Sequence, residues 1–528
     1  MAHTKSYNNY QWNTLHQNGA YPVDGLLSTQ LEPSANLPLA VDRYNDAAAE
    51  IQQLLLSALN ANQGFRAFGS RWSLSNIAYH PDRMHHNKLM NLQLPLGQED
   101  IHEQSTLEAD KLFFFQCGTT IKSISRALAR AGKSLKTSGA SNGQTIAGCI
   151  STGVHGSTFD FGAVQDFVKG INLIIGPKPE DVVYLERQSE PALSDDFAKR
   201  IQARVIRDDA LFNAALVGLG GFGFIHGVLI EAEDRYLLKR YIKKIPKQVA
   251  MELANTMDFT HPEFRIAEEV DETGQNNRPY FYKIYVNPYN EQEEYIVELM
   301  YKKDYVSGYP DPIPAVKKSI YRDLIHLFIK IAERAPKSIP GLIQLLRKAV
   351  LPVENEVLTG TLAEMFWDAG YQGPAFACSF GIDHRYSEKG MQLMSDLVNE
   401  VGPIPGLFAL RFVKQSDATL AFTKFPVTCV LEIDGVQWEA SKQLLSLKEF
   451  SKKMIDTLRL NDIPFTMHWG KNADWVYPRL VERMFGEKVN EWLRQRSILM
   501  TEEKQRLFDN PFLERIGLSC PAAEPTIV

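Results

Sequence analysis

Residues 138–157 read SGASNGQTIAGCISTGVHGS, and this stretch decides the fold. Its glycines leave room for backbone N–H groups to approach an anion closely, and its hydroxyl side chains add further donors. Its apolar residues follow neither a helical nor an alternating period. We therefore expect an irregular segment here, either a phosphate-binding loop or an ordinary glycine-rich surface loop.

The order of the residues favours the phosphate-binding alternative. The run Gln144-Thr-Ile-Ala-Gly, followed by Ser151-Thr-Gly-Val-His-Gly, resembles the pyrophosphate-binding segment of the vanillyl-alcohol oxidase and p-cresol methylhydroxylase flavoproteins. The resemblance is closest to the sugar-lactone, alditol and type II cholesterol oxidase branch. In that family the segment wraps the diphosphate of FAD and continues under the flavin ring. The resemblance thus implies FAD contacts at Ser138, Gly139, Ser141, Asn142, Thr145, Gly148, Ser151, Thr152 and His155.

A second motif lies upstream, where the family has Arg-x-x-Gly-x-Gly-His-Ser in a tight turn. Residues 66–73 read RAFGSRWS, so Arg66, Gly69 and Ser73 match the pattern. Arg71 replaces the second glycine, and we expect a less unusual backbone conformation there. The implied cofactor-binding residues are Arg66, Ala67, Phe68, Gly69, Ser70, Arg71, Trp72 and Ser73.

Trp72 replaces the histidine that bonds covalently to the flavin in many relatives. Indole nitrogen is only a donor and no practical nucleophile, so this link cannot form at Trp72. Some relatives carry a second, cysteine-based link near the position of Ser141 or Asn142, where this chain has no cysteine. Cys149 is out of register and is expected to be a small buried thiol. We therefore predict non-covalent FAD.

A third glycine motif, GLGGFG at residues 218–223, satisfies the G-x-G-x-x-G dinucleotide fingerprint. That fingerprint needs a strand before it and a helix after it. Here residues 208–216 have a helical pattern and residues 224–232 have that of a strand, which argues against a Rossmann fold. In the resembling family this order of elements places backbone against the flavin and the adenine, which implies contacts at Gly223, Ile225 and Val228.

Two late motifs also resemble the flavin family. The tetrapeptide His468-Trp-Gly-Lys471 resembles a C-terminal element of the lactone and alditol oxidases that closes back onto the FAD domain. Its lysine would stabilise negative charge on the reduced flavin, and the resemblance implies a cofactor contact at His468. Arg411 matches an arginine that polarises a substrate oxygen in the family. The alternatives are a surface Lys471 and an Arg411 that only pairs with an acid such as Asp417.

Ala409 stands where the family has a glutamate two residues before this arginine. Hydride abstraction from an alcohol carbon is easier when a base accepts the hydroxyl proton, so the missing acid weakens a sugar-alcohol or lactone assignment. Three explanations remain open. Another residue, Glu432 or a tyrosine, supplies the base, or the substrate needs none, or the protein has lost efficient turnover.

The periodicity divides the chain. Small strands and helices alternate up to about residue 240, with helices expected over residues 47–59 and 121–131 and strands over 111–117, 134–138 and 166–175. Strand patterns at 280–286 and 294–300 follow. We predict an α+β fold. A two-subdomain FAD-binding domain of p-cresol methylhydroxylase type (residues 1–240) precedes an α+β substrate domain with a central antiparallel sheet (241–460). A C-terminal segment (461–528) packs back on the FAD site.

Composition fits a large globular enzyme. The 528 residues carry 57 Lys plus Arg against 63 Asp plus Glu, a net charge of −6 that offers no footprint for nucleic acid. No apolar run is long enough for a membrane span, the N-terminus lacks the apolar core of a secretory signal, and the five cysteines are scattered, so a cytoplasmic location is expected. His80, His85 and His86 lack metal-ligand spacing, and we expect a solvated loop there and no metal.

These patterns and the resemblance together predict an FAD-dependent oxidoreductase that takes a hydride from a small-molecule substrate, an alcohol or a related compound, with Arg411 and Lys471 as catalytic residues. Oxidase and dehydrogenase activity stay open, as does the oligomeric state. The alternative function is a catalytically degenerate FAD-binding protein with a binding or regulatory role.

Overall fold

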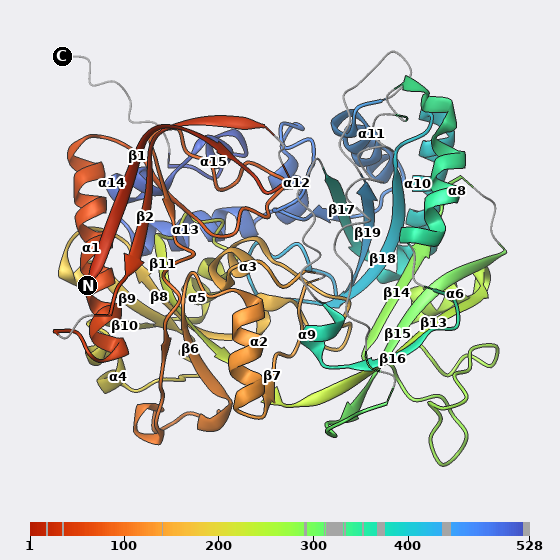
Figure 1. The fold of residues 1–528 in the computed structure, drawn as a ribbon. Coiled ribbons are helices and arrows are strands. Elements are labelled where there is room, and N and C mark those ends of the chain that lie inside the picture. The colour runs from red at the N-terminus through yellow and green to blue at the C-terminus, as the bar shows by residue number, and fades with distance from the viewer. Residues whose placement is uncertain are drawn as a thin grey trace.

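The structure is a computed structural model, and it describes residues 1–16, 19–33, 36–139, 141–289, 293–310, 312, 331, 334–350, 353–366, 375–435 and 445–520. Two sheets and their helices form the N-terminal half, and one large sheet forms the other half (Figure 1). The last described helices return to the N-terminal half and lie on the same side of the molecule as the N-terminus.

The first sheet has four strands in the order β1-β2-β4-β3. They are β1 (Ala2–Asn13), β2 (Ala20–Leu31), β3 (Phe65–Phe68) and β4 (Arg83–His86). The expected solvated loop around His85 is therefore wrong, because β4 lies between two parallel partners. His85 is fully buried, and its Nε2 lies 2.8 Å from Thr29 Oγ1.

The second sheet has six strands in the order β10-β9-β8-β11-β6-β5. They are β5 (Gln93–Leu94), β6 (Leu112–Gln116), β8 (Val168–Ile174), β9 (Val182–Glu186), β10 (Arg204–Arg207) and β11 (Phe224–Glu231). Helices α1 (Ala40–Asn60), α2 (Ile121–Arg130) and α5 (Asp209–Leu216) lie where the periodicity predicts them. The sequence placed a strand at 134–138, but the small strand β7 covers only Lys133–Ser134, paired with β12 (Glu233–Asp234).

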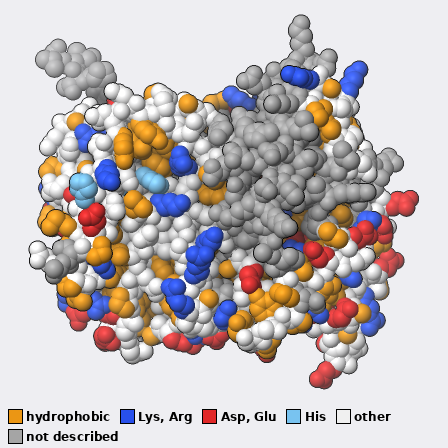
Figure 2. All heavy atoms as spheres, viewed as in Figure 1, with side chains coloured by type: hydrophobic (Ala, Val, Ile, Leu, Met, Phe, Trp, Pro, Cys, Tyr) orange, Lys and Arg blue, Asp and Glu red, His pale blue; other side chains and the backbone are white. Residues whose placement is uncertain are grey.

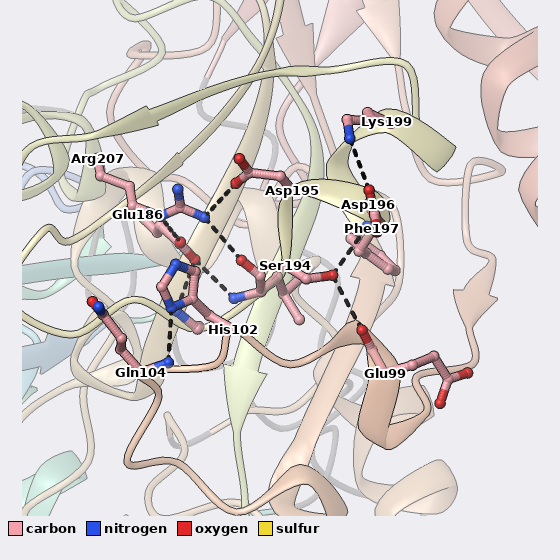
Figure 3. Close-up of polar contacts among 12 residues, drawn as sticks. Glu99, His102, Gln104, Glu186, Ser194, Asp195, Asp196, Phe197, Lys199 and Arg207 are labelled. Atoms are coloured by element: carbon pink, nitrogen blue, oxygen red, sulfur yellow. Dashed lines mark hydrogen bonds and ion pairs between the residues drawn. The ribbon is translucent and has the colours of Figure 1, made fainter.

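A buried ion network joins the parallel pair β9 and β10 (Figure 3). Glu186 is fully buried and accepts hydrogen bonds from the backbone N–H groups of Ala192 and Leu193. Arg207 Nε lies 2.8 Å from Glu186 Oε1, and Arg207 Nη2 reaches Asp195 at 2.9 Å. Each polar atom of this carboxylate thus has a structural partner, and the network fixes the edge of the sheet.

The third sheet has eight strands in the order β16-β13-β15-β14-β18-β19-β17-β20, all antiparallel. They are β13 (Tyr236–Pro246), β14 (Phe281–Val286), β15 (Glu294–Asp304), β16 (Val357–Gly360), β17 (Phe376–Asp383), β18 (Gly406–Lys414), β19 (Val427–Gly435) and β20 (Phe465–Met467). This is the central antiparallel sheet expected for the second half.

Helix α10 (Ser387–Val401) packs against one face of this sheet. A Cβ at Gly390 would lie 2.6 Å from Ile382 Cδ1 and 2.9 Å from Leu431 Cδ1, so glycine permits the close approach. Because side chains alternate along a strand, Glu432 and Asp434 project from the opposite face. Helices α6 (Lys247–Thr256) and α11 (Leu447–Leu460) pack beside α10.

Four short helices end the described chain: α12 (Leu480–Phe485), α13 (Lys488–Leu499), α14 (Glu502–Phe508) and α15 (Pro511–Arg515). Arg496 of α13 is fully buried, donates to Gly221 O at 2.7 Å and pairs with Asp509 at 2.7 Å. Asn510 donates to the carbonyls of Ile77 and Tyr79. These helices are therefore tied to the third glycine motif, at residues 218–223, and to the segment after β3.

The surface is mixed in charge. Figure 2 shows Lys and Arg side chains interspersed with Asp, Glu and hydrophobic ones on the face it draws. None of the helices in the described part of the chain has both the length and the apolar character needed to cross a bilayer.

Candidate functional site

A cavity of about 380 Å³ lies where the two halves of the molecule meet. Its walls come from the turn after β3, the glycine-rich stretch 139–155, the start of β11, and the strands β17 to β19 with the loop after β20. A cavity of this size is typical of a small-molecule site.

Most of the predicted site residues line this cavity. They are Arg66, Ala67, Phe68, Gly69, Ser70, Arg71, Trp72, Ser73, Gly139, Ser141, Thr145, Gly148, Ser151, Thr152, His155, Gly223, Ile225, Arg411, His468 and Lys471. Ser138, Asn142 and Val228 do not line it. Ser138 donates to Gly139 O, Asn142 donates to Ala363 O at 3.4 Å, and Val228 packs in the main core.

The cavity also has lining residues that the motifs did not indicate. They include His16, Glu432, Asp434 and Phe508. Glu432 is one of the alternative bases that the sequence offers without a position. The other three lie outside the recognised motifs. Gln144, which begins the quoted pyrophosphate motif, lines the cavity as well.

Gly69 brings the two FAD-family motifs into contact. A Cβ at this position would lie 2.0 Å from Thr145 Oγ1 and 2.8 Å from its Cγ2. Only a glycine therefore allows the turn after β3 to approach the glycine-rich stretch this closely.

Arg71 corrects one expectation. Its φ is +63°, in the left-handed region that favours glycine, so the backbone there is not the less unusual one expected. That conformation costs about 1–2 kcal/mol for a residue with a Cβ. The turn is held by a hydrogen bond from Leu15 N to Arg71 O at 2.8 Å, which links it to the segment after β1.

The glycine-rich stretch is also more regular than expected. Helix α3 (Ile146–Thr152) begins after Thr145 and ends at Gly153, whose φ is +73°. Its buried residues, including Ile146, Cys149 and Ile150, pack into the core. The sequence pattern missed this helix because it has only seven residues and its glycine and serine lower helix propensity.

The residues of this cavity fit FAD. The side-chain oxygens Ser70 Oγ, Gln144 Oε1 and Thr145 Oγ1 are buried and have no hydrogen-bond partner among the described residues. Buried polar atoms of this kind are normally paired, here by a ligand or water. Hydroxyl donors suit phosphate oxygens, and glycine-flanked backbone lets an anion approach.

Arg66 places a buried cation at one end of the cavity. Its Nη1 donates to Phe508 O at 2.8 Å, and its Nη2 donates to Ile77 O at 3.1 Å and to Leu219 O. Burial, together with the Arg496 cation, lowers the pKa of Arg66 to about 9. Arg66 is therefore still charged at neutral pH, and its charge favours an anion nearby.

Trp72 lines the cavity beside His16. Their ring centroids are 5.6 Å apart with the rings at 73°. The indole thus occupies the motif position of the linking histidine, while a histidine from the segment after β1 lies against it.

At the other end of the cavity, Glu432 joins Arg411 and Lys471. Arg411 Nε lies 2.8 Å from Glu432 Oε2, and Lys471 Nζ contacts Glu432 Oε1. The expected alternative partner of Arg411, Asp417, is not the one observed. Burial and, after it, the nearby Arg411 cation lower the pKa of Lys471 well below its usual value.

Two buried histidines complete this end. Gly470 N donates to His468 Nδ1 at 3.0 Å, which assigns the proton of the neutral ring to Nε2. Burial lowers the pKa of His468 to about 4 and lowers that of His155 as well. Both rings are therefore neutral at pH 7.

Sequence comparison finds relatives among sugar-lactone oxidases. The chain is 33% identical over 121 residues to L-gulonolactone oxidase 3 of Arabidopsis thaliana, and 25% identical over 215 residues to D-arabinono-1,4-lactone oxidase of Candida glabrata. These alignments cover 22% and 41% of the chain but only 18% and 36% of the relatives. No protein-family model matches the chain.

Structure comparison covers the whole chain. Cholesterol oxidase from B. sterolicum matches 98% of both chains with a TM-score of 0.64 at 12% identity. A solvent-stable cholesterol oxidase matches 98% of both with a TM-score of 0.65, also at 12% identity. The resemblance to the lactone and cholesterol oxidase branch is thus confirmed in local sequence and in fold, and with it the predicted α+β fold.

Proposed function

We propose that this chain, with the fold of the cholesterol oxidases and local sequence similarity to sugar-lactone oxidases, is an FAD-dependent oxidoreductase acting on the CH–OH group of a small molecule. The observation that carries the proposal is one cavity that joins the two glycine motifs to Arg411, Glu432 and Lys471. A bound flavin would accept a hydride from the substrate carbon.

The chain's own residues have separate tasks in this proposal. The turn at residues 66–73 and the stretch 139–155 hold the diphosphate and exclude water from it. Arg411 holds the substrate oxygen where negative charge develops, and Lys471 supports negative charge on the reduced ring. His468 and His155, being neutral, add no repulsion to these two cations.

Anaerobic mixing tests the function. Purified yellow protein is mixed without oxygen with a panel of alcohols, lactones, sterols and amines, and loss of flavin absorbance is followed. We expect at least one hydroxyl compound to bleach the flavin. If flavin is bound and no compound reduces it, the chain is a binding protein and the proposal is wrong. Comparing the rates at which air and an artificial dye reoxidise the reduced flavin then distinguishes an oxidase from a dehydrogenase.

The proposal also includes non-covalent FAD, in the manner of a vanillyl-alcohol oxidase relative without the linking histidine. Trp72 supports this part, since indole nitrogen is no practical nucleophile. Acid precipitation should release all flavin into the supernatant. Flavin that stays with the precipitate contradicts the proposal, and the variant His16→Ala would then show whether the neighbouring imidazole carries the link.

We further propose a reducing, cytoplasmic environment. All five cysteines are unpaired and four of them are buried, which suits a compartment that keeps thiols reduced. Subcellular fractionation with an antibody against the chain tests this part.

A further inference from the structure

The glutamate expected at position 409 is absent, but strand pairing puts a carboxylate beside that position. In the pairing of β18 with β19, Ala409 lies directly opposite Glu432. Directly opposed residues project to the same face, with Cβ atoms about 4.5–5.5 Å apart. Arg411, two residues after Ala409, shares that face as well. Glu432 thus extends from the neighbouring strand into the space that a side chain at 409 would use.

Building on the proposed function, we propose that Glu432 is the catalytic carboxylate that accepts the proton of the substrate hydroxyl, in place of the acid missing at Ala409.

The contacts of Glu432 support this assignment. The residue is fully buried, yet it lines the cavity, and Ser379 Oγ donates to its Oε1 at 3.3 Å. Lys471 contacts the same oxygen. Neither Glu432 Oε2 nor Arg411 Nε, although 2.8 Å apart, has an aligned hydrogen bond among the described residues. A substrate hydroxyl that engages these buried atoms would therefore displace their ion pair but no aligned hydrogen bond.

The other charged groups on this face are less suited to the task. The side chain of Asp434 is 47% exposed and lies 4.0 Å from Arg411, so solvent screens it. Lys283 lies opposite Arg411 on β14, with its ammonium over the Tyr285 ring at 4.2 Å. Burial and the Arg411 cation lower the pKa of Lys283 to about 7, but the lysine is not among the cavity-lining residues.

The reaction step balances. The O–H bond of the alcohol breaks and its proton passes to Glu432, while the electron pair of that bond forms the second bond of the carbonyl. The C–H bond breaks, and the hydrogen leaves with both electrons for the flavin. The substrate loses two electrons and the flavin gains them. Arg411 stabilises the oxygen as its negative charge develops.

Moving the carboxylate from position 432 on β19 to position 409 on β18 tests the inference. Stopped-flow measurements would follow anaerobic flavin reduction in Glu432→Gln, Glu432→Ala and the double variant Ala409→Glu/Glu432→Ala. We expect the two single variants to slow reduction by about 100-fold or more, the usual range for a lost general base. The double variant restores the acid on the same face and should recover at least about tenfold over Glu432→Ala. Retained flavin and the thermal midpoint are recorded for each.

The control is Glu298→Gln. Glu298 is a buried carboxylate on β15 of the same sheet, where it accepts a hydrogen bond from Tyr285 at 2.6 Å, outside the cavity. Its loss should lower stability without slowing reduction.

The outcomes separate the two proposals. If Glu432→Gln reduces at the native rate, or if the double variant folds, keeps flavin and stays as slow as Glu432→Ala, the role of Glu432 is refuted while the oxidoreductase proposal stands. If no compound reduces the flavin of the native protein, the proposed function fails and the role of Glu432 fails with it.

Discussion

At the scale of single residues, the site depends on a few close approaches that sequence motifs indicate only in part. Gly69 was expected from its motif, and the structure gives the reason, since any Cβ would collide with Thr145. Arg71 shows the opposite case, because a residue with a side chain predicts an ordinary backbone conformation and the structure has a left-handed one at φ +63°. The fold around a position can therefore hold a conformation that the residue itself disfavours.

The variant Gly69→Ala should lose cofactor. Its Cβ would lie 2.0 Å from Thr145 Oγ1, and such overpacking costs about 1–3 kcal/mol. We expect a lower ratio of flavin to protein absorbance and a lower thermal midpoint. Gly341→Ala is the control, because a Cβ there meets nothing within 4 Å. Equal flavin content in both variants would show that the Gly69 approach is unimportant for binding.

At the scale of elements, strand β11 carries a buried histidine at the centre of the six-stranded sheet. His226 Nε2 lies 3.0 Å from Tyr44 O, so the neutral ring donates there, and burial lowers its pKa to about 4. An unfolded histidine titrates near 6.5, so between pH 6.5 and 4 the unfolded chain binds more protons. The stability from neutral His226 is complete above pH 6.5 and is lost as the pH falls toward 4.

Urea unfolding measured from pH 7 to 4.5 tests whether neutral His226 contributes stability that is lost in acid. In His226→Gln the side-chain amide can still donate to Tyr44 O but does not titrate. The free energy of unfolding should then fall less steeply with acid, by about 1.4 kcal/mol per pH unit. His3→Gln, on the exposed part of strand β1, should leave the slope as it is. An unchanged slope in His226→Gln would mean that the ring binds its proton in the folded protein as readily as in the unfolded chain, and the prediction would be wrong.

The elements that the sequence predicted are those with clear periodicity, such as α1, α2 and β11. The short helix α3 and the strand β4 were missed, since each is stabilised by packing against other segments rather than by its own pattern. The pairing of Ala409 with Glu432 was equally invisible, because register between β18 and β19 is a long-range property. The motifs thus indicated most of the residues that line the cavity around Arg66, and they gave no position for the proposed base.

At the scale of the whole molecule, the C-terminal helices close the end of the cavity where Arg66 lies. Phe508 of α14 lines the cavity and accepts a hydrogen bond from Arg66. Arg496 of α13 ties the same region to Gly221 and pairs with Asp509. Arg66 and Phe508, which are 442 positions apart in the chain, therefore belong to one wall of the cavity.

The variant Arg496→Met tests this wall. It would leave Asp509 buried without its cation, which costs about 3–5 kcal/mol. We expect a lower unfolding free energy by that amount and weaker flavin retention on gel filtration. Arg494→Met on the same helix is the control, since its side chain is 61% exposed and pairs with Glu491, and it should change stability by less than about 1 kcal/mol. Similar losses in both variants would exclude a special role for Arg496.

The pairing of Ala409 with Glu432 has a consequence for how such sites diverge. Two neighbouring strands offer two starting points for a side chain that ends in the same place, so an acid can move between them in two substitutions while its position in space hardly changes. A column-by-column alignment would record such an exchange as the loss of an acid at position 409 and an unrelated gain at position 432. A survey that separates active from inactive enzymes by one fixed residue pair would discard such a chain. A survey that also examines the position facing it on the neighbouring strand would keep it.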